Sequence, residues 1–284
     1  MSEPTVRGKV VVITGATTGI GRIAAERLAG QGARIVMVAR DRERAEATLA
    51  WLREVGPDAA HRAHYADLSL VAEVKRAGAE IAAAEPRVDV LINNAGSMFG
   101  ARKITQEGLE RTFALNHMSY FVLTHGLRAR LHAAAPSRVV NTASAAHLRA
   151  TLDFDDLQSA GTYRAGVAYG RSKLCNILFT RELARQLAGT GVTANCLHPG
   201  FVATNFGQRD AGLFGWVLRG AMMFARPPEP GANTIVHLAS SPLLADVSGG
   251  YFYDSRQIEP SPAARDDATA QRLWQESEKI AGFV

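Results

Sequence analysis

Apolar and polar positions along this 284-residue chain form two kinds of run. Short, nearly continuous apolar runs rich in Val and Ile are typical of strands that are buried on both faces of a sheet. Longer charged runs lie between them and repeat their apolar positions every three or four residues, as amphipathic helices do. The pattern therefore predicts strands and helices that follow one another along the chain.

The predicted strands lie at 10–14, 34–40, 60–65, 88–93, 138–144, 192–197 and 250–253. A first predicted helix begins at the glycines of 15–21, and later helices cover 41–55, 68–85, 106–135, 168–187, 231–239 and 262–281. No linker or repeat divides this series, so we expect one α/β domain over 1–284. Alternating strands and helices of this kind predict a doubly wound parallel sheet with helices on both faces.

Three glycines follow the first strand, at Gly15, Gly19 and Gly21. Glycines between a strand and a helix let the backbone approach a pyrophosphate, and the helix N-terminus offers free N–H groups and a positive dipole. The alternative is an ordinary tight turn whose glycines serve packing alone. Because the strand and the helix supply the context that the motif requires, we favour a Rossmann-type dinucleotide site.

Ligands of such sheets bind beyond the carboxyl ends of the strands, and the residues at those ends are unusual as a set. Each of them, taken singly, has a structural explanation such as helix capping or a turn. Together they predict a cofactor site, and they are Arg40, Asp67, Leu68, Asn94, Ala95, Gly96, Ser144, Pro199 and Gly200.

Arg40 ends the second strand, where NAD-specific sites of this kind place an acidic residue. A guanidinium suits a 2′-phosphate because it donates two parallel hydrogen bonds, and Arg22 could assist. Asp41 is the opposing signal, although it serves equally well as a helix cap. We therefore predict NADP(H), with NAD(H) as the less favoured alternative.

Tyr169 and Lys173 lie four residues apart in a predicted helix and so share one face. A neighbouring ammonium stabilises a phenolate, so we expect Lys173 to lower the pKa of Tyr169 toward working pH. Ser144 could hold a carbonyl oxygen by a hydrogen bond. Asn116 is an awkward residue inside a helix and could fix a water that relays protons to Lys173.

Composition limits the other classes of function. The net charge of +5 comes mainly from Arg scattered among acidic residues, which does not predict nucleic-acid binding. No stretch approaches the roughly twenty apolar residues of a membrane span, and 1–7 lacks a signal-peptide core. Cys175 and Cys196 suggest no disulfide framework. We expect a cytoplasmic protein without a metal site.

These motifs, in this order, resemble the short-chain dehydrogenase/reductase family from about residue 8 to 255. The resemblance implies that Tyr169 is the catalytic acid/base, that Lys173 lowers its pKa and binds the nicotinamide ribose, that Ser144 orients the substrate oxygen, and that Asn116 completes a proton relay. It places Thr204 near the nicotinamide carboxamide. The further cofactor-binding residues that it implies are Thr17, Thr18, Ile20 and Val202.

Finer features are similar to the retinol dehydrogenase-like branch. They are the stretches 39–41, 168–183, 198–200 and 272–274, and a long gap between Ser144 and Tyr169 with an insert at 153–157. This branch typically uses NADP(H). The chain lacks that branch's N-terminal membrane anchor, so we expect a soluble bacterial relative with another substrate.

The stretch 201–228 follows the sixth strand and carries apolar pairs at 213/214, 217/218 and 221/222 among several glycines. We predict a lid over a hydrophobic carbonyl or alcohol; docking on the core or a subunit contact in a homo-oligomer is the alternative. Two other functions stay open. One is a carbon–carbon double-bond reductase resembling protochlorophyllide reductase, and the other is a non-catalytic NADP-binding regulator.

Overall fold

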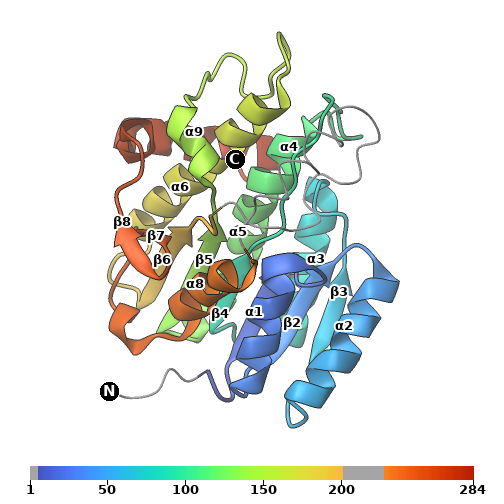
Figure 1. Ribbon diagram of the computed structural model, residues 1–284. Coiled ribbons are helices and arrows are strands. Elements are labelled where there is room, and N and C mark those ends of the chain that lie inside the picture. The colour runs from blue at the N-terminus through green and yellow to red at the C-terminus, as the bar shows by residue number, and fades with distance from the viewer. Residues whose placement is uncertain (1–5, 201–226) are drawn as a thin grey trace.

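The strands form one eight-stranded sheet in the computed structural model, which describes residues 6–200 and 227–284 (Figure 1). The spatial order is β3-β2-β1-β4-β5-β6-β7-β8. All neighbours are parallel except β7 and β8. The strands are β1 (Val10–Thr14), β2 (Arg34–Ala39), β3 (Arg62–Tyr65), β4 (Val90–Asn93), β5 (Ser137–Thr142), β6 (Val192–Leu197), β7 (Tyr251–Tyr253) and β8 (Arg256–Ile258).

The strand β1 lies in the middle of the sheet and pairs with β2 on one side and β4 on the other. Its five residues are all buried, which explains why its sequence is apolar without alternation. The chain runs outward from β1 through β2 to β3 and then returns to β4. The strand order therefore reverses between β1 and β4, and such sheets bind their ligands beyond the carboxyl ends of the strands at this point.

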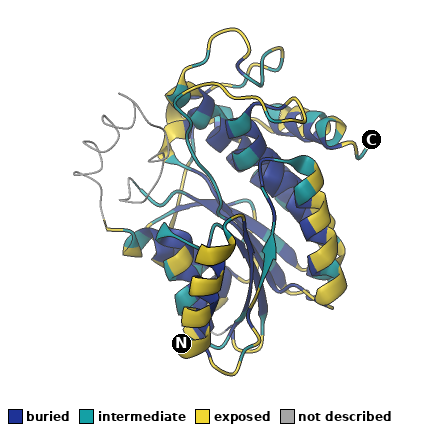
Figure 2. Ribbon diagram, turned by 90° about the vertical axis from the view of Figure 1, so that its right-hand side faces the viewer, coloured by how far each residue is buried: buried dark blue, intermediate teal, exposed yellow. Residues whose placement is uncertain are grey.

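Helices cover both faces of this sheet (Figure 1). One face carries α1 (Gly19–Gly30), α2 (Arg42–Val55) and α8 (Glu229–Ser240). The other carries α3 (Val71–Ala84), α5 (Ser119–Ala133) and α6 (Ala165–Gln186), with α9 (Asp267–Ala281) packed on α6. Buried residues fill both interfaces, and the exposed ones lie on the outer helix surfaces (Figure 2). The predicted doubly wound α/β fold is confirmed.

The predicted helix at 106–135 is wrong at its start and in its regularity. It begins only at α4 (Arg111–Phe113), because Glu110 accepts hydrogen bonds from the backbone N–H groups of Thr112 and Phe113 and so caps the helix. A π-helical turn, Ala114–Met118, then separates α4 from α5. Such turns insert an extra residue and are frequent at functional sites.

Other boundaries differ by a few residues. The helix predicted at 68–85 begins at Val71, after a turn in which Leu70 N–H donates to Asp67 O. The helix predicted at 262–281 is divided into a 3₁₀ turn, Pro262–Arg265, and α9, which Asp266 caps. The short strand β8 has three exposed residues and no alternation, so the sequence did not predict it. Within the described ranges, no helix combines the length and the hydropathy that a membrane span needs.

Candidate active site

The glycine turn after β1 is packed as a phosphate-binding turn requires. Gly15 and Gly19 have φ of +70° and +57°, a backbone region that side chains disfavour. A Cβ on Gly15 would lie 2.9 Å from the Cα of Ala95, and a Cβ on Gly21 would overlap the carbonyl oxygen of Gly15. The turn therefore lies directly against the loop after β4.

Asn94 fixes this turn to its neighbours. The hydroxyl of Thr14 accepts the backbone N–H groups of Asn94 and Ala95, both at 2.9 Å. The side-chain amide of Asn94 donates to the carbonyl oxygens of Thr14 and Gly15 at 3.2 and 3.3 Å. Its own oxygen accepts from the hydroxyl of Thr142 at 3.3 Å. The ends of β1, β4 and β5 are thus held as one unit.

The helix α1 begins at this turn with Thr18 as its N-cap. Thr18 makes no side-chain capping bond in the described structure, and the first turn of α1 contains no acidic residue. Pro199 lies close by, because a Cβ on Gly231 would be 2.7 Å from the Cβ of Pro199 and 3.3 Å from Cγ2 of Ile20. The glycine turn, the helix N-terminus and the Pro199 loop therefore form a cradle that fits a dinucleotide pyrophosphate.

Arg40 and Asp67 form an ion pair at the ends of β2 and β3, with 3.5 Å between Nη1 of Arg40 and Oδ2 of Asp67. Burial alone would raise the pKa of Asp67, but hydrogen bonds from Ser69 and the Arg40 charge outweigh it and lower the pKa. Asp41 caps α2 by accepting the N–H of Arg44 at 3.1 Å. The sequence left two roles open for Asp41, a helix cap or a signal against NADP(H), and the structure shows it as the helix cap. Arg40 is half exposed at the end of β2.

Tyr169 and Lys173 lie on α6, as predicted. The ammonium of Lys173 is buried, donates to Thr142 O at 2.9 Å, and lies 5.7 Å from the centre of the Tyr169 ring. Burial lowers the pKa of Lys173 to about 7. Burial also raises the pKa of Tyr169 to about 12, although a hydrogen bond with Ser144 opposes this.

The pKa of Tyr169 in the protein alone is therefore raised, and the expected net shift toward working pH is wrong. The physical reason is that both groups are buried, and burial disfavours the phenolate and the ammonium together. The phenol of Tyr169 is consequently protonated near neutral pH and is a proton donor. Lys173, by contrast, is poised between its two protonation states.

Asn116 lies in the π-helical turn and joins three segments. Its oxygen accepts the N–H of Ser97, and its amide donates to Ser97 O and to the hydroxyl of Ser172, each at 2.9 Å. A Cβ on Gly96 would lie 3.2 Å from both the Asn116 oxygen and the Lys173 nitrogen. Asn116 and Lys173 therefore face the same glycine after β4.

Ser144 follows β5, and its hydroxyl accepts the N–H of Ala146 at 3.2 Å. Four residues around this centre were not predicted. Two of them had a signal in the sequence, since Thr142 ends the fifth strand and Ser172 lies inside the Tyr-x3-Lys motif. The other two, Tyr120 and His147, are fully buried, and nothing in the local sequence marks them. Lys173 lies 5.6 Å from the centre of the Tyr120 ring.

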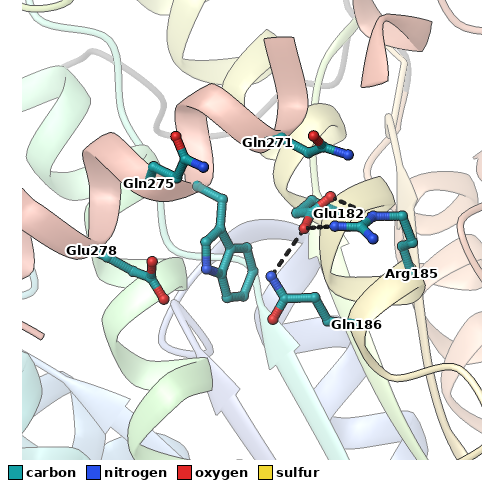
Figure 3. Close-up of a pocket in the computed structure, with 7 residues that line it drawn as sticks. Glu182, Arg185, Gln186, Gln271, Gln275 and Glu278 are labelled. Carbon is teal, nitrogen blue, oxygen red and sulfur yellow. Dashed lines mark hydrogen bonds and ion pairs between the residues drawn. The ribbon is translucent and has the colours of Figure 1, made fainter. Parts of the chain in front are cut away.

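Two cavities in the described structure differ in their relation to this site. A groove of about 450 Å³ lies between α6 and α9 and is lined by Glu182, Arg185, Gln186, Gln271, Trp274, Gln275 and Glu278 (Figure 3). It lies on helix surfaces rather than at strand ends. A cavity of about 360 Å³ is lined by Ala146 and Gly170, which neighbour the catalytic positions in the sequence, and by Arg149, Arg164 and Arg171; Ser144, Tyr169 and Lys173 are not in its wall. Val202, Thr204 and almost all of the lid predicted at 201–228 lie outside the described residues.

Comparisons with known proteins agree with this geometry. The sequence profile of the short chain dehydrogenase family matches residues 9–211. Human retinol dehydrogenase 13 is 40% identical over 289 residues, which cover 99% of this chain and 87% of that protein. The chain belongs to the short-chain dehydrogenase family, whose members are NAD(P)-dependent oxidoreductases acting on CH–OH or C=O groups. Within this family it is retinol dehydrogenase-like.

Solved structures support the same assignment. The structure of an uncharacterized protein from Mycobacterium paratuberculosis superimposes with a TM-score of 0.78 at 30% identity, covering 98% of this chain and 95% of that one. The Pseudomonas aeruginosa RhlG/NADP active-site complex has a TM-score of 0.70 at 28% identity, covering 87% of this chain and 95% of that one.

Proposed function

We propose that this protein is an NADP(H)-dependent oxidoreductase that interconverts a carbonyl and an alcohol on a lipophilic small molecule. The observation that carries the proposal is the meeting of Tyr169, Ser144 and Lys173 at the end of β5, beside the glycine turn after β1. Each group has a distinct task in hydride chemistry. The whole of 1–284 serves as one cofactor-binding and catalytic domain.

When bound, the nicotinamide supplies or takes up the hydride at its C4 atom. In the reductive direction Tyr169 gives its phenolic proton to the substrate oxygen as the carbonyl carbon gains hydride. Ser144 donates a hydrogen bond to that oxygen and holds it near the phenol. Because burial raises the pKa of Tyr169 to about 12, the phenol carries its proton at neutral pH.

Lys173 and Asn116 support this proton transfer. The Lys173 ammonium lies within 6 Å of the Tyr169 ring centre, at 5.7 Å, and stabilises negative charge that develops on the phenol. Asn116 keeps the Ser97 loop and α6 together, so the floor of the site holds its shape around Gly96. Asn116 therefore holds the Ser97 loop and α6 in place, and Lys173 stabilises negative charge on Tyr169.

Arg40 supports NADP(H) rather than NAD(H). Its guanidinium ends β2 and is half exposed, so it can donate to a 2′-phosphate while it keeps Asp67 as its partner. The Asp41 carboxylate caps α2, so it does not serve as the acidic residue that binds the ribose 2′-hydroxyl in NAD-specific sites. The name of the Pseudomonas aeruginosa neighbour records NADP in its active site.

Both alternative functions receive less support. A double-bond reductase of the protochlorophyllide type would use an added cysteine, and the side chains of Cys175 and Cys196 are both buried in the core. A non-catalytic NADP-binding protein would have no need of all four groups Asn116, Ser144, Tyr169 and Lys173. The retinol dehydrogenase relatives support a lipophilic substrate.

The direct test is the absorbance of the reduced nicotinamide during turnover. Purified protein is mixed with NADPH or NADH and a panel of aldehydes and ketones that includes retinaldehyde, straight-chain aldehydes and ω-carboxy aldehydes. We expect oxidation of NADPH with the lipophilic carbonyls and slower oxidation of NADH. Absence of turnover with every carbonyl, by a protein that binds NADPH, would refute the proposal.

A further inference from the structure

His147 makes two hydrogen bonds that define its protonation. It lies in the 3₁₀ turn Ala145–Arg149, three residues after Ser144, and is fully buried. The backbone N–H of Ser261 donates to Nε2 over 3.2 Å, so Nε2 is an acceptor without a proton. Nδ1 then carries the hydrogen and donates to the carbonyl oxygen of Ser144 over 2.7 Å. The two partners require the neutral Nδ1–H tautomer.

These two bonds connect the end of β5 to a distant part of the chain. Ser261 precedes the 3₁₀ turn Pro262–Arg265 that leads into α9. Tyr251 of β7 packs edge-on against the imidazole, with ring centres 5.1 Å apart and its hydroxyl 3.4 Å from Nδ1. Tyr251 also contacts the ring of His198, which precedes the Pro199 loop, at 5.5 Å. The imidazole therefore joins β5, β7 and the C-terminal segment at one point.

We propose that His147 is a positioning residue that fixes the backbone of Ser144 and so the direction of the Ser144 hydroxyl. This inference rests on the proposed function, because the hydroxyl is the group that holds the substrate oxygen. His147 acts through the carbonyl oxygen of Ser144, which accepts both the Nδ1–H at 2.7 Å and the backbone N–H of His147 at 3.2 Å. Small misplacements of a positioning group are costly, since about 1 Å can lower turnover about 100-fold.

Burial lowers the pKa of His147, although its hydrogen bond to Ser144 opposes this. The neutral form is therefore the one that persists at neutral pH. Both ring nitrogens are needed in their present roles. The side chain consequently acts as a fixed spacer of set length between two backbone groups.

Two substitutions separate the two bonds. In His147→Asn the side-chain amide nitrogen takes the place of Nδ1 and keeps the donor for the Ser144 carbonyl. In His147→Gln the longer side chain reaches the place of Nε2 and keeps an acceptor for Ser261 N–H. Each variant removes the ring, so we expect both to lose similar thermal stability and to keep the NADPH dissociation constant of the unaltered protein.

The turnover of the two variants should nevertheless differ. We expect His147→Gln to lose about 10- to 100-fold in kcat, with KM for the carbonyl changed much less. His147→Asn keeps the hydrogen bond to the Ser144 carbonyl, so its kcat should stay within about threefold of that of the unaltered protein. A tenfold loss of kcat would correspond to about 1.4 kcal/mol of lost transition-state stabilisation. Equal losses of kcat in the two variants, or no loss in either, would overturn the proposal.

A second readout does not depend on turnover. The Ala146 N–H donates to the Ser144 hydroxyl, so its amide resonance in NMR spectra reports where that oxygen lies. Both variants lose the imidazole ring next to Ala146, so its chemical shift moves in both, and the informative quantity is the temperature coefficient of this amide proton, which reports its hydrogen bond. We expect the coefficient to change in His147→Gln and to stay in His147→Asn. An unchanged or equally changed coefficient in both variants overturns the positioning role. Inactivity of the unaltered protein refutes the proposed function instead, and the Ala146 resonance still decides the role of His147.

Discussion

Replacement of the buried Lys173 by Met should change how stability depends on pH. The folded-state pKa of Lys173 is about 7, because burial disfavours the ammonium, whereas an exposed lysine titrates near 10.4. Between these values the unfolded chain binds a proton that the folded chain has released. The free energy of unfolding of the unaltered protein must therefore rise with pH in this window.

The size of this rise follows from the two pKa values. Integration of the linkage relation between about pH 7 and pH 8.5 gives about 1.5 kcal/mol for this one group. In Lys173→Met the rise is absent, so the difference between the two proteins should change by that amount. The thiols of Cys175 and Cys196, whose pKa burial raises to about 12, oppose the trend at higher pH. They cancel in the difference because both proteins contain them.

The assay is urea unfolding of both proteins at several pH values in this window, with the m-value checked for constancy. Lys279→Met is the matched control, because Lys279 lies on the surface of α9 and pairs with Glu276. We expect the control to follow the unaltered protein at every pH. Parallel curves for Lys173→Met and the unaltered protein would show that Lys173 is not held near its titration point, and the reasoning from burial would be wrong.

Three other predictions concern the cofactor and the substrate. Arg40→Asp should weaken NADPH binding by about 2 kcal/mol and NADH binding much less. The control Arg53→Asp, at an exposed position in the last turn of α2, should spare both. An unchanged NADPH/NADH ratio in Arg40→Asp would assign the phosphate to another residue. Gly21→Ala should abolish NADPH binding in fluorescence titrations and cost about 1–3 kcal/mol of stability, because its Cβ would overlap the carbonyl oxygen of Gly15. The control Gly30→Ala in the same helix has open space around its Cβ and should be neutral. Normal NADPH binding by Gly21→Ala would contradict the proposed cradle. Catalytic efficiency should rise along straight-chain aldehydes by up to about 0.8 kcal/mol per buried methylene, and Trp216→Ala should flatten this rise. A flat profile in the unaltered protein would exclude the predicted lid and would favour a small or polar substrate.

The parts of the fold that the sequence predicted are those that local pattern determines. The residues of β1 form an unbroken apolar run because the strand is buried on both faces, and β1 and β6 have the predicted limits. The glycine turn was predictable because close backbone approach leaves room for no other residue. Asn94 and Ser144 were found because the carboxyl ends of parallel strands gather at one edge.

The parts that were not predicted depend on distant contacts. The π-helical turn at Ala114–Met118 inserts one residue without disturbing the apolar pattern, so the periodicity of 106–135 gave no sign of it. His147 has its partners in β7 and at Ser261, more than a hundred residues later. The pKa values of Tyr169 and Lys173 depend on how deeply packing buries them, and helical spacing contains no such information.

The measurement that tests the central claim most directly is single-turnover reduction of a lipophilic aldehyde with NADPH by Tyr169→Phe. The substitution keeps the ring and removes only the hydroxyl that gives the proton. Tyr65→Phe is the control, since the Tyr65 hydroxyl bonds to Glu46 at the surface. We expect NADPH to bind both variants normally and the rate of Tyr169→Phe to fall by at least about 100-fold. A Tyr169→Phe rate close to that of the control, in a folded protein that binds NADPH, would contradict the assignment of Tyr169 as the proton donor.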